Sequence, residues 1–190
     1  MAKNDTREKI IKTSLELFAQ FGYTSTSTKQ IAQEACVNEV TIFRHFGTKD
    51  KLFQEVMREY VESLEFSQKI GVYEKLPVDE CVKKIGREYL DYCFDNFEIY
   101  KIQMKMQDNI EQMNKLQLSK TYVSGCTTYF NHLKEKGLIK NDPEKLANIF
   151  ILSVLGFFNF YVLADNMEHD YIYELLDLHM ESFIKGNIYI

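Results

Sequence analysis

Helical spacing of apolar side chains is the feature that most restricts what this chain can fold into. Apolar residues recur three and four positions apart through most of the 190 residues. No stretch of useful length alternates apolar and polar residues, as a half-buried strand would. The chain has only two prolines, Pro77 and Pro143, so few helices are interrupted. The sequence therefore predicts an all-α protein of about nine helices.

Four helices are expected before the first long break, at about residues 6–21, 28–35, 39–45 and 49–69. Gly22 and Gly47 are predicted to end the first and the third of them. Small hydroxylated residues at 24–28 predict a loop that ends in an N-cap for the second helix. Thr48 can cap the long fourth helix in the same way.

The stretch from Gly71 to Pro77 is the first real break in the helical pattern. Five further helices are expected after it, at about residues 79–96, 98–108, 113–136, 143–164 and 170–186. The pattern thus predicts a small N-terminal unit, about 1–48, that a long helix joins to a larger helical bundle.

Charge is unevenly distributed along the chain. The net charge is −5, yet residues 1–50 hold seven Lys or Arg and six Asp or Glu. Residues 51–190 hold sixteen and twenty-two of these residues. A nucleic-acid-binding end attached to an acidic body has such a distribution.

The expected cellular location follows from the cysteines and from the most apolar segment. Cys36, Cys81, Cys93 and Cys126 show no close pairing, which favours a reduced intracellular chain over disulfides or zinc, and no cofactor is expected. Residues 1–20 lack the apolar run of a signal peptide. The charge-free stretch Ile149–Ala164 is shorter than the roughly 20 residues of a bilayer span. We interpret it as a buried or interfacial helix and expect a soluble, cytoplasmic protein.

The segment from Thr28 to Leu52 has the physical pattern of a helix-turn-helix. Small or branched residues on one face of the first short helix, such as Ile31 and Ala35, let a second helix cross it closely. Ile42 and Phe46, four positions apart, can anchor that second helix. Its outer face then carries Asn38, Glu39, Thr41, Arg44 and His45. Spacing alone leaves a generic corner between two helices as an equal alternative.

The same segment resembles the DNA-binding domain of the TetR family of bacterial repressors. The family pattern is met at Thr28, Ile31, Ala32, Ala35, Val37, Thr41, Ile42, Phe43, His45, Phe46, Thr48, Lys49, Asp50 and Leu52. These matches cover about a quarter of the chain. The resemblance implies a helix-turn-helix DNA-binding domain at residues 1–48 and a helical ligand-binding and dimerisation domain at 49–190. It implies a ligand-responsive repressor that binds a palindromic operator as a dimer.

Two positions depart from the family pattern. Cys36 stands where the family usually has glycine in the turn, so a left-handed backbone there would cost about 1–2 kcal/mol. Val40 stands where glycine is frequent at the recognition surface. Its side chain could contact a thymine methyl group, or it could pack against Phe43.

Candidate DNA-binding residues combine positions that match the family with cations and polar groups beside them. They are Thr28, Lys29, Asn38, Val40, Thr41, Phe43, Arg44, His45 and Lys49. Thr28, at a helix N-terminus, and Lys49 are expected to hold phosphates. Core packing is the alternative for Phe43, and a hydrogen bond within the domain is the alternative for His45. Glu39 would repel phosphates, so if it faces DNA we expect it to read a cytosine or to exclude wrong sites.

The family resemblance also assigns two sets of residues in the second half of the chain. Helices rich in aromatic and sulfur side chains would enclose a pocket for an apolar or amphipathic effector. The candidate lining is Tyr89, Tyr92, Cys93, Phe97, Tyr100, Met104, Tyr122, Cys126, Tyr129 and Phe130. The last two helices would form the dimer interface through Phe150, Ser153, Gly156, Phe157, Phe160, Leu175 and His179. Plain core packing is the alternative for both sets.

Other classes of protein fit the sequence less well. The chain has no glycine-rich phosphate loop, no Gly-x-Ser-x-Gly and no His-Glu-x-x-His, so we expect no enzyme. Two alternatives stay open, a transcriptional activator of the same fold and a helical interaction protein without DNA binding.

Overall fold

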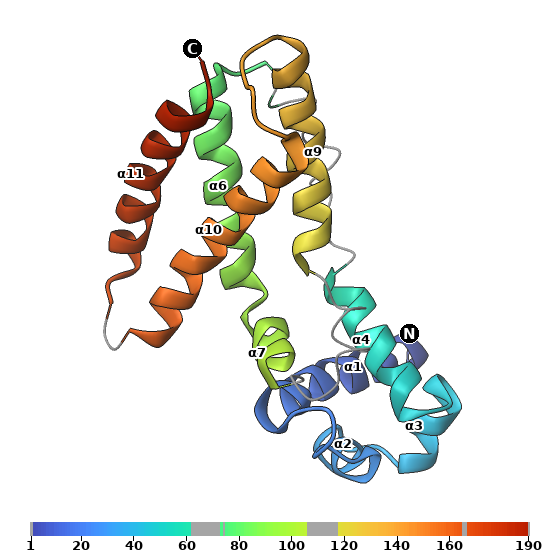
Figure 1. Cartoon of the computed structure of the whole chain (residues 1–190). Helices are drawn as coiled ribbons and strands as arrows, with labels where there is room; N and C mark the ends of the chain where they lie inside the picture. The colour runs from blue at the N-terminus through green and yellow to red at the C-terminus, as the bar shows by residue number, and fades with distance from the viewer. Residues whose placement is uncertain (1, 62–72, 74, 106–117, 165–166, 190) are drawn as a thin grey trace. The chain divides into compact units, whose positions relative to one another are not determined.

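The computed structural model describes residues 2–61, 73, 75–105, 118–164 and 167–189. All regular structure in these residues is helical, with nine helices and no strand, which confirms the predicted fold class (Figure 1). The helices are α1 (Ala2–Phe21), α2 (Thr28–Glu34), α3 (Glu39–Phe46), α4 (Lys49–Val61), α6 (Val78–Asp95), α7 (Phe97–Lys105), α9 (Leu118–Glu135), α10 (Pro143–Leu163) and α11 (His169–Asn187). The predicted continuation of the fourth helix to residue 69 lies outside the described residues.

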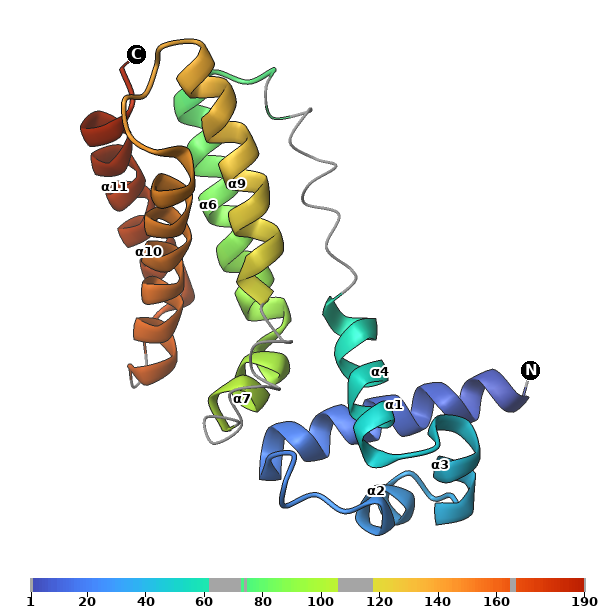
Figure 2. The ribbon, with the colours of Figure 1, turned by 45° about the vertical axis from the view of Figure 1, so that its right-hand side comes forward.

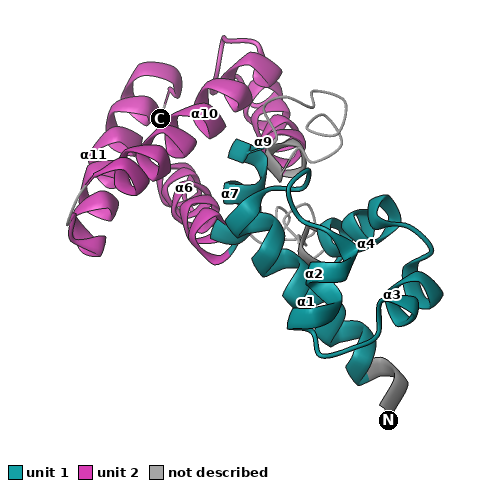
Figure 3. Ribbon diagram, turned by 90° about the horizontal axis from the view of Figure 1, so that it is seen from below, with its two compact units in different colours: residues 1–63, 96–117 teal, residues 64–95, 118–190 magenta. Residues whose placement is uncertain are grey.

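The helices form two compact units, drawn in separate colours in Figure 3. The first unit comprises Met1–Ser63 and Asn96–Gln117, and the second comprises Leu64–Asp95 and Leu118–Ile190. The sequence predicts a boundary after residue 48, which would assign both α4 and α7 to the second part of the chain. In the structure both helices pack on α1, because their apolar sides cover its apolar face.

The first unit is built around α1. In Figure 2, α2 and α3 lie below α1 and α4 crosses it, and these helices contact one another. The core between them contains Phe18 and Phe53, whose ring centroids are 5.3 Å apart in an edge-to-face arrangement. Lys105, the last residue of α7, donates to the backbone oxygens of Ala19 and Gln20 at 2.7 and 2.5 Å. Its ammonium therefore satisfies carbonyls that the end of α1 leaves without helical partners.

Side-chain caps set the limits of the short helices. Ser27 caps α2 by accepting a hydrogen bond from the backbone N–H of Gln30, so Thr28 is the first residue of that helix. Asn38 caps α3 in the same manner. Gly47, with a φ of 79°, ends α3, and Thr48 accepts a hydrogen bond from the Lys51 N–H, as the sequence predicts.

The turn between α2 and α3 contains a residue in the left-handed backbone region. Cys36 has a φ of 51°, and it alone among the described non-glycine residues has a positive φ. The strain expected at this departure from the family pattern is therefore present, at about 1–2 kcal/mol relative to glycine. The thiol of Cys36 is exposed and forms no disulfide.

The second unit packs α10 against α6, α9 and α11. Phe150 of α10 lies at its centre, with ring centroids 6.0 Å from Phe130 and 5.2 Å from Phe183. By length and composition alone, α10 is apolar enough to cross a membrane, the one such helix among the described residues. A core helix of a soluble protein passes the same test. In this unit one side of α10 lies in the core, which agrees with our interpretation of the charge-free stretch.

Candidate nucleic-acid interface

Helix α3 carries the surface that the sequence predicts to face DNA. Ile42 and Phe46 anchor it in the core of the first unit, with exposed fractions of 1% and 6%. On the other side, Val40 is 71% exposed, Phe43 is 47% exposed, and Arg44 is exposed as well. A helix that is anchored on one side and open on the other can enter the major groove, which is about 12 Å wide.

Val40 and Phe43 lie one turn apart on this open side. Large apolar side chains on the surface of a short helix can contact the methyl groups of thymines. Core packing was the alternative for Phe43, but nearly half of its side chain is exposed. The two side chains are therefore available to a partner of the first unit.

The remaining candidates on α2 and α3 differ in how free their side chains are. Lys29 is exposed, whereas Thr41 and His45 are half-buried. The His45 ring lies 5.9 Å from that of Phe46. The side-chain oxygen of Asn38 accepts a hydrogen bond from the Val40 N–H at 2.9 Å, so its amide group is the part that can reach outward.

A hydrogen bond joins the first turns of α2 and α3. The Thr28 hydroxyl donates to a carboxylate oxygen of Glu39 across 2.7 Å. Glu39 lies in the first turn of α3, where the helix dipole favours a negative charge. The hydroxyl expected to hold a phosphate is therefore engaged by a carboxylate in this structure.

The start of α4 presents Lys49 beside an aromatic ring. The Lys49 ammonium lies 4.2 Å from the centroid of the Tyr23 ring. The Tyr23 hydroxyl donates a hydrogen bond to the Asp50 carboxylate. Desolvation by burial lowers the pKa of Lys49, and the charge of Asp50 opposes this shift. The sequence identifies Lys49 but not its aromatic support, because Tyr23 comes from the loop before α2.

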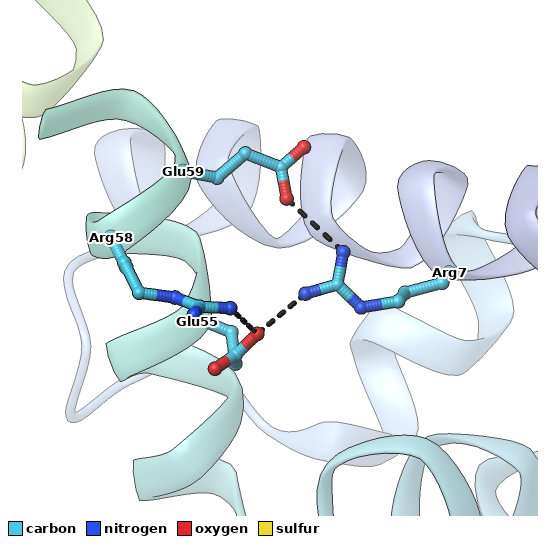
Figure 4. A network of polar contacts seen from close by, with 4 residues as sticks. All are labelled: Arg7, Glu55, Arg58 and Glu59. Carbon is cyan, nitrogen blue, oxygen red and sulfur yellow. Dashed lines mark hydrogen bonds and ion pairs between the residues drawn. The ribbon is translucent and has the colours of Figure 1, made fainter. Parts of the chain in front are cut away.

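A cluster of charged side chains links α1 to α4 (Figure 4). The Arg7 guanidinium lies 2.5 Å from Glu55 and 3.3 Å from Glu59, its two carboxylate partners on α4. Arg58 also contacts Glu55, at 2.6 Å. The Arg7 guanidinium lies 5.9 Å from the ring of Phe46, the last residue of α3. One cation thus contacts the two helices on either side of the turn at Gly47.

Seven of the ten candidate effector-binding residues lie buried in the second unit. They are Tyr89, Tyr92, Cys93, Tyr122, Cys126, Tyr129 and Phe130. The Tyr122 ring centroid is 4.6 Å from that of Tyr89 and 5.3 Å from that of Tyr92, so α6 and α9 share an aromatic cluster. Such a cluster is either the lining of a pocket or plain core.

The other three candidates, Phe97, Tyr100 and Met104, lie on α7 in the first unit. Phe97 and Tyr100 stack with ring centroids 6.2 Å apart. The side chain of Met104 is 50% exposed. Helical spacing does not show to which unit a helix belongs. The sequence-based prediction therefore grouped aromatic residues of both units into one candidate pocket lining.

Sequence reasoning missed an acidic residue next to the tyrosine cluster. Glu88 on α6 accepts a hydrogen bond from the hydroxyl of the buried Tyr73. Burial is the main cause of the raised pKa of Tyr122, and the charge of Glu88 adds to it. Glu88 precedes Tyr92 by four positions on a helix, a spacing that would have predicted their proximity.

Two thiols of the second unit, those of Cys93 and Cys126, are buried. Burial raises the pKa of Cys93 to about 12 and also raises that of Cys126. Both residues are therefore neutral thiols at physiological pH, a form that does not bind metals. Within the residues that the structure describes, no three His, Cys, Asp or Glu side chains are grouped to hold a metal ion.

The candidate interface residues on α10 and α11 occupy three kinds of position. Phe150 lies in the core, with 1% of its side chain exposed. Phe157 and His179 are half-buried against each other, with ring centroids 5.3 Å apart. Gly156 and Phe160 are exposed. Ser153 and Leu175 are half-buried.

Exposed apolar side chains form a stripe on α10 that the sequence identified only in part. Its members are Ile149, Leu152, Phe160 and Leu163, which are 59%, 64%, 53% and 83% exposed. Leu178 on α11 is exposed by 64%. Spacings of three and four from Phe160 could have predicted Leu163. We call the four α10 residues the outer stripe.

Comparisons with known proteins agree with this geometry. Residues 10–56 match the family model for bacterial regulatory proteins of the tetR family. The HTH-type transcriptional regulator YvkB of Bacillus subtilis (strain 168) is 27% identical over 160 residues, 80% of this chain and 81% of that protein.

Two solved structures share the fold over nearly the whole chain. NalD, the secondary repressor of the MexAB-OprM multidrug efflux pump in Pseudomonas aeruginosa, has a TM-score of 0.72 and 18% identity and covers 99% of this chain and 98% of its own. The transcriptional regulator FadR from Bacillus subtilis, in complex with stearoyl-CoA, has a TM-score of 0.74 and 16% identity. That alignment covers 94% of this chain and 98% of FadR.

An open recognition helix on a helix-turn-helix unit, joined to a helical second unit, defines a DNA-binding transcriptional regulator rather than an enzyme. The matches narrow this class. Residues 10–56 are a DNA-binding domain of the TetR family of bacterial regulatory proteins, and the chain is similar over most of its length to a bacterial transcriptional regulator.

Proposed function

We propose that this regulator is a repressor that binds a palindromic operator as a homodimer and releases it when an effector binds. The observation that carries the proposal is the open side of α3, where Val40, Phe43 and Arg44 are exposed beside Lys49 at the start of α4. Apolar groups and a guanidinium can read base edges, while the lysine can hold a phosphate. Such a protein acts in the bacterial cytoplasm, where the chromosome lies.

Selection from random duplexes tests the DNA-binding part of the proposal. We expect a symmetric site whose half-sites are about 34–36 Å apart, one helical turn. The dissociation constant should fall between about 10⁻⁸ and 10⁻¹¹ M at physiological salt. It should rise steeply with salt, because contacts to phosphates release counterions. Selection that returns no symmetric sequence would overturn the palindromic operator.

Alanine variants separate residues that read bases from residues that hold the backbone. Lys49→Ala should weaken binding to all sequences alike and flatten the salt dependence. Arg44→Ala should cost about 1–3 kcal/mol at particular base pairs if its guanidinium reaches a base edge. Lys136→Ala, an exposed lysine of the second unit, is the matched control and should leave binding unchanged.

Dimerisation through α10 and α11 is part of the proposal. The outer stripe leaves four large apolar side chains in water, and contiguous exposed apolar surface marks interaction sites. Gly156 lies within it, and a Cβ at that position would meet no atom within 4 Å. A helix of a second copy therefore has room to approach the α10 backbone closely at Gly156.

A charge placed in the outer stripe tests the dimer. Leu152→Glu would bury a carboxylate without a partner, which is costly. We expect it to give monomers by sedimentation and to lose binding to the palindrome. Asn131→Glu, at an exposed position on α9, is the control and should remain dimeric. Wild-type protein that stays folded and monomeric at micromolar concentration would overturn the dimer.

An apolar or amphipathic effector completes the proposal. Buried tyrosines on α6 and α9 offer rings and hydroxyls to a molecule with an apolar body and a polar end. FadR, which shares the fold, holds stearoyl-CoA, so acyl-CoA esters and free fatty acids are the first molecules to test.

Linkage gives the effector experiment a sharp criterion. An effector that releases DNA must bind less tightly when the operator is present, by the same factor by which it weakens DNA binding. A coupling of about 1–3 kcal/mol corresponds to about 5- to 150-fold. Equal affinity with and without operator would show that the molecule does not regulate binding. A reporter that gains transcription when the protein is added would indicate an activator instead.

A further inference from the structure

Tyr23 lies between two oppositely charged side chains at the start of α4. Its ring packs against the core, with centroids 5.7 Å from Phe18 and 4.9 Å from Phe53. The Lys49 ammonium lies over this ring, 4.2 Å from the centroid, and the Tyr23 hydroxyl donates to the Asp50 carboxylate. The Tyr23 side chain thus contacts both charged groups, the Lys49 ammonium through its ring and the Asp50 carboxylate through its hydroxyl.

We propose that Tyr23 is a positioning residue for DNA binding, whose ring holds the Lys49 ammonium toward a phosphate while its hydroxyl holds the Asp50 carboxylate away from that ammonium. This inference rests on the proposed role of Lys49 as a phosphate contact. It adds a residue outside the helix-turn-helix and assigns a function to the ring and to the hydroxyl separately.

The ring acts by restricting a flexible chain. A lysine side chain rotates about four bonds, so it loses much rotamer freedom when a contact fixes its ammonium. The face of a tyrosine ring attracts a cation through its quadrupole without neutralising the charge. Lys49 held over Tyr23 is therefore already ordered before a phosphate arrives, and it still carries its positive charge.

The hydroxyl acts on the neighbouring carboxylate. Lys49 and Asp50 are consecutive on a helix, where side chains point in different directions, and among the described residues no ion pair joins them. Desolvation by burial outweighs the attraction of Asp50 in setting the pKa of Lys49, which agrees with an ammonium placed on a ring rather than on a carboxylate. Burial, together with the bond to Asp50, raises the pKa of Tyr23, so the hydroxyl remains a donor at physiological pH.

A double-mutant cycle on DNA binding tests the role of the ring. The probe is a labelled duplex of mixed sequence, because phosphate contacts do not depend on sequence. Dissociation constants are measured over a range of salt for the full-length wild type, Tyr23→Leu, Lys49→Met and the double variant. We expect Tyr23→Leu to weaken binding about 2- to 5-fold and to flatten the salt dependence, but only where Lys49 is present.

A second cycle tests the hydroxyl with less disturbance of the core. Tyr23→Phe keeps the ring and its packing but frees Asp50 to approach Lys49. We expect it to flatten the salt dependence in the wild-type background and to have no effect in an Asp50→Asn background. The salt dependence is the main readout, because an unfolded fraction that is the same at every salt concentration changes the apparent affinity but leaves the slope unchanged.

The outcomes distinguish a failure of this inference from a failure of the proposed function. Lys49→Met that leaves affinity and slope unchanged would show that Lys49 is no phosphate contact, and it would overturn both that proposed role of Lys49 and the positioning role of Tyr23. Lys49→Met that weakens binding while Tyr23→Leu has equal effects with and without Lys49 would overturn the positioning role alone. A Tyr23→Phe effect that persists in the Asp50→Asn background would overturn the part assigned to the hydroxyl.

Discussion

The hydroxyl of Thr28 and the carboxylate of Glu39 lie 2.7 Å apart and form the hydrogen bond that joins the first turns of α2 and α3. Both groups lie where phosphates approach helix N-termini. In this structure the Glu39 carboxylate accepts the Thr28 hydrogen bond that a phosphate would otherwise accept. A phosphate at Thr28 would therefore have to compete with a negative charge that belongs to the protein.

Removal of that charge should strengthen binding to DNA of any sequence. Glu39→Gln keeps an oxygen that can accept from Thr28 but no longer repels phosphates. We expect the affinity for a mixed-sequence duplex to rise by about 0.3–1 kcal/mol, the size of a charge effect at a helix N-terminus. Equilibrium binding measures this change, with Glu16→Gln, an exposed glutamate of α1, as the control. Unchanged affinity in Glu39→Gln would place Glu39 away from the bound phosphates.

Glycine at the turn should stabilise the protein. Cys36 has a φ of 51°, which glycine adopts without the steric cost of a Cβ. The greater entropy of glycine in the unfolded chain offsets part of the gain. We expect Cys36→Gly to raise the free energy of unfolding by about 0.5–1 kcal/mol in urea titrations. Cys36→Ala keeps the Cβ and should give no gain, so equal stabilisation by both would argue against relief of backbone strain.

The two glutamates that contact Arg7 should contribute unequally to stability. Glu55 contacts both Arg7 and Arg58, at 2.5 and 2.6 Å, whereas Glu59 contacts Arg7 alone at 3.3 Å. Partly exposed ion pairs contribute about 0.2–1 kcal/mol each, so Glu55→Gln should cost more than Glu59→Gln. Urea titrations at low and high salt measure this difference, which should shrink as salt rises. A larger loss in Glu59→Gln would contradict the geometry.

Acid should destabilise the second unit through His179. Burial lowers the pKa of His179 below its ordinary 6.5, and its Nε2 atom is buried without a partner in the described part of the chain. As the pH falls through about 6.5, the unfolded chain takes up this proton while the folded chain resists it, so stability falls. The loss ends once the pH is below the folded pKa.

His179→Phe keeps a ring against Phe157 and removes the proton site. We expect the variant to lose less stability than the wild type when thermal melts at about pH 7.5 and 5.5 are compared. An equal loss in both proteins would show that His179 does not cause the acid sensitivity.

Helix positions were predictable because local rules determine them. Caps and turn residues such as Ser27, Asn38 and Gly47 lie within a few residues of the ends they set. The periodic anchors Ile42 and Phe46 identified the buried side of α3, and that part of the prediction is confirmed. The sequence also identified Cys36 as a position where a left-handed backbone would be costly, and the backbone there is left-handed.

Contacts between distant segments were not predictable in the same way. Helix α10 is apolar on all sides, so its periodicity could not separate Phe150 in the core from Leu152 on the surface. Nothing local to α7 reveals that Lys105 reaches the end of α1. The contact between Tyr23 and Lys49 joins a loop residue to a helix residue 26 positions later in the sequence. Helical spacing predicts contacts only between residues three or four positions apart.

Helix α7 also has a consequence for synthesis of the protein on the ribosome. The first unit is made from two stretches of chain, and its second stretch contains Lys105, which caps α1. Protein domains generally fold as units as the chain emerges, N-terminal part first. Here the DNA-binding unit cannot be completed when residue 63 emerges, because α6 of the other unit must be translated before α7. The nascent chain therefore acquires its finished DNA-binding unit only after residue 105 has been translated, some 40 residues later than residue 63.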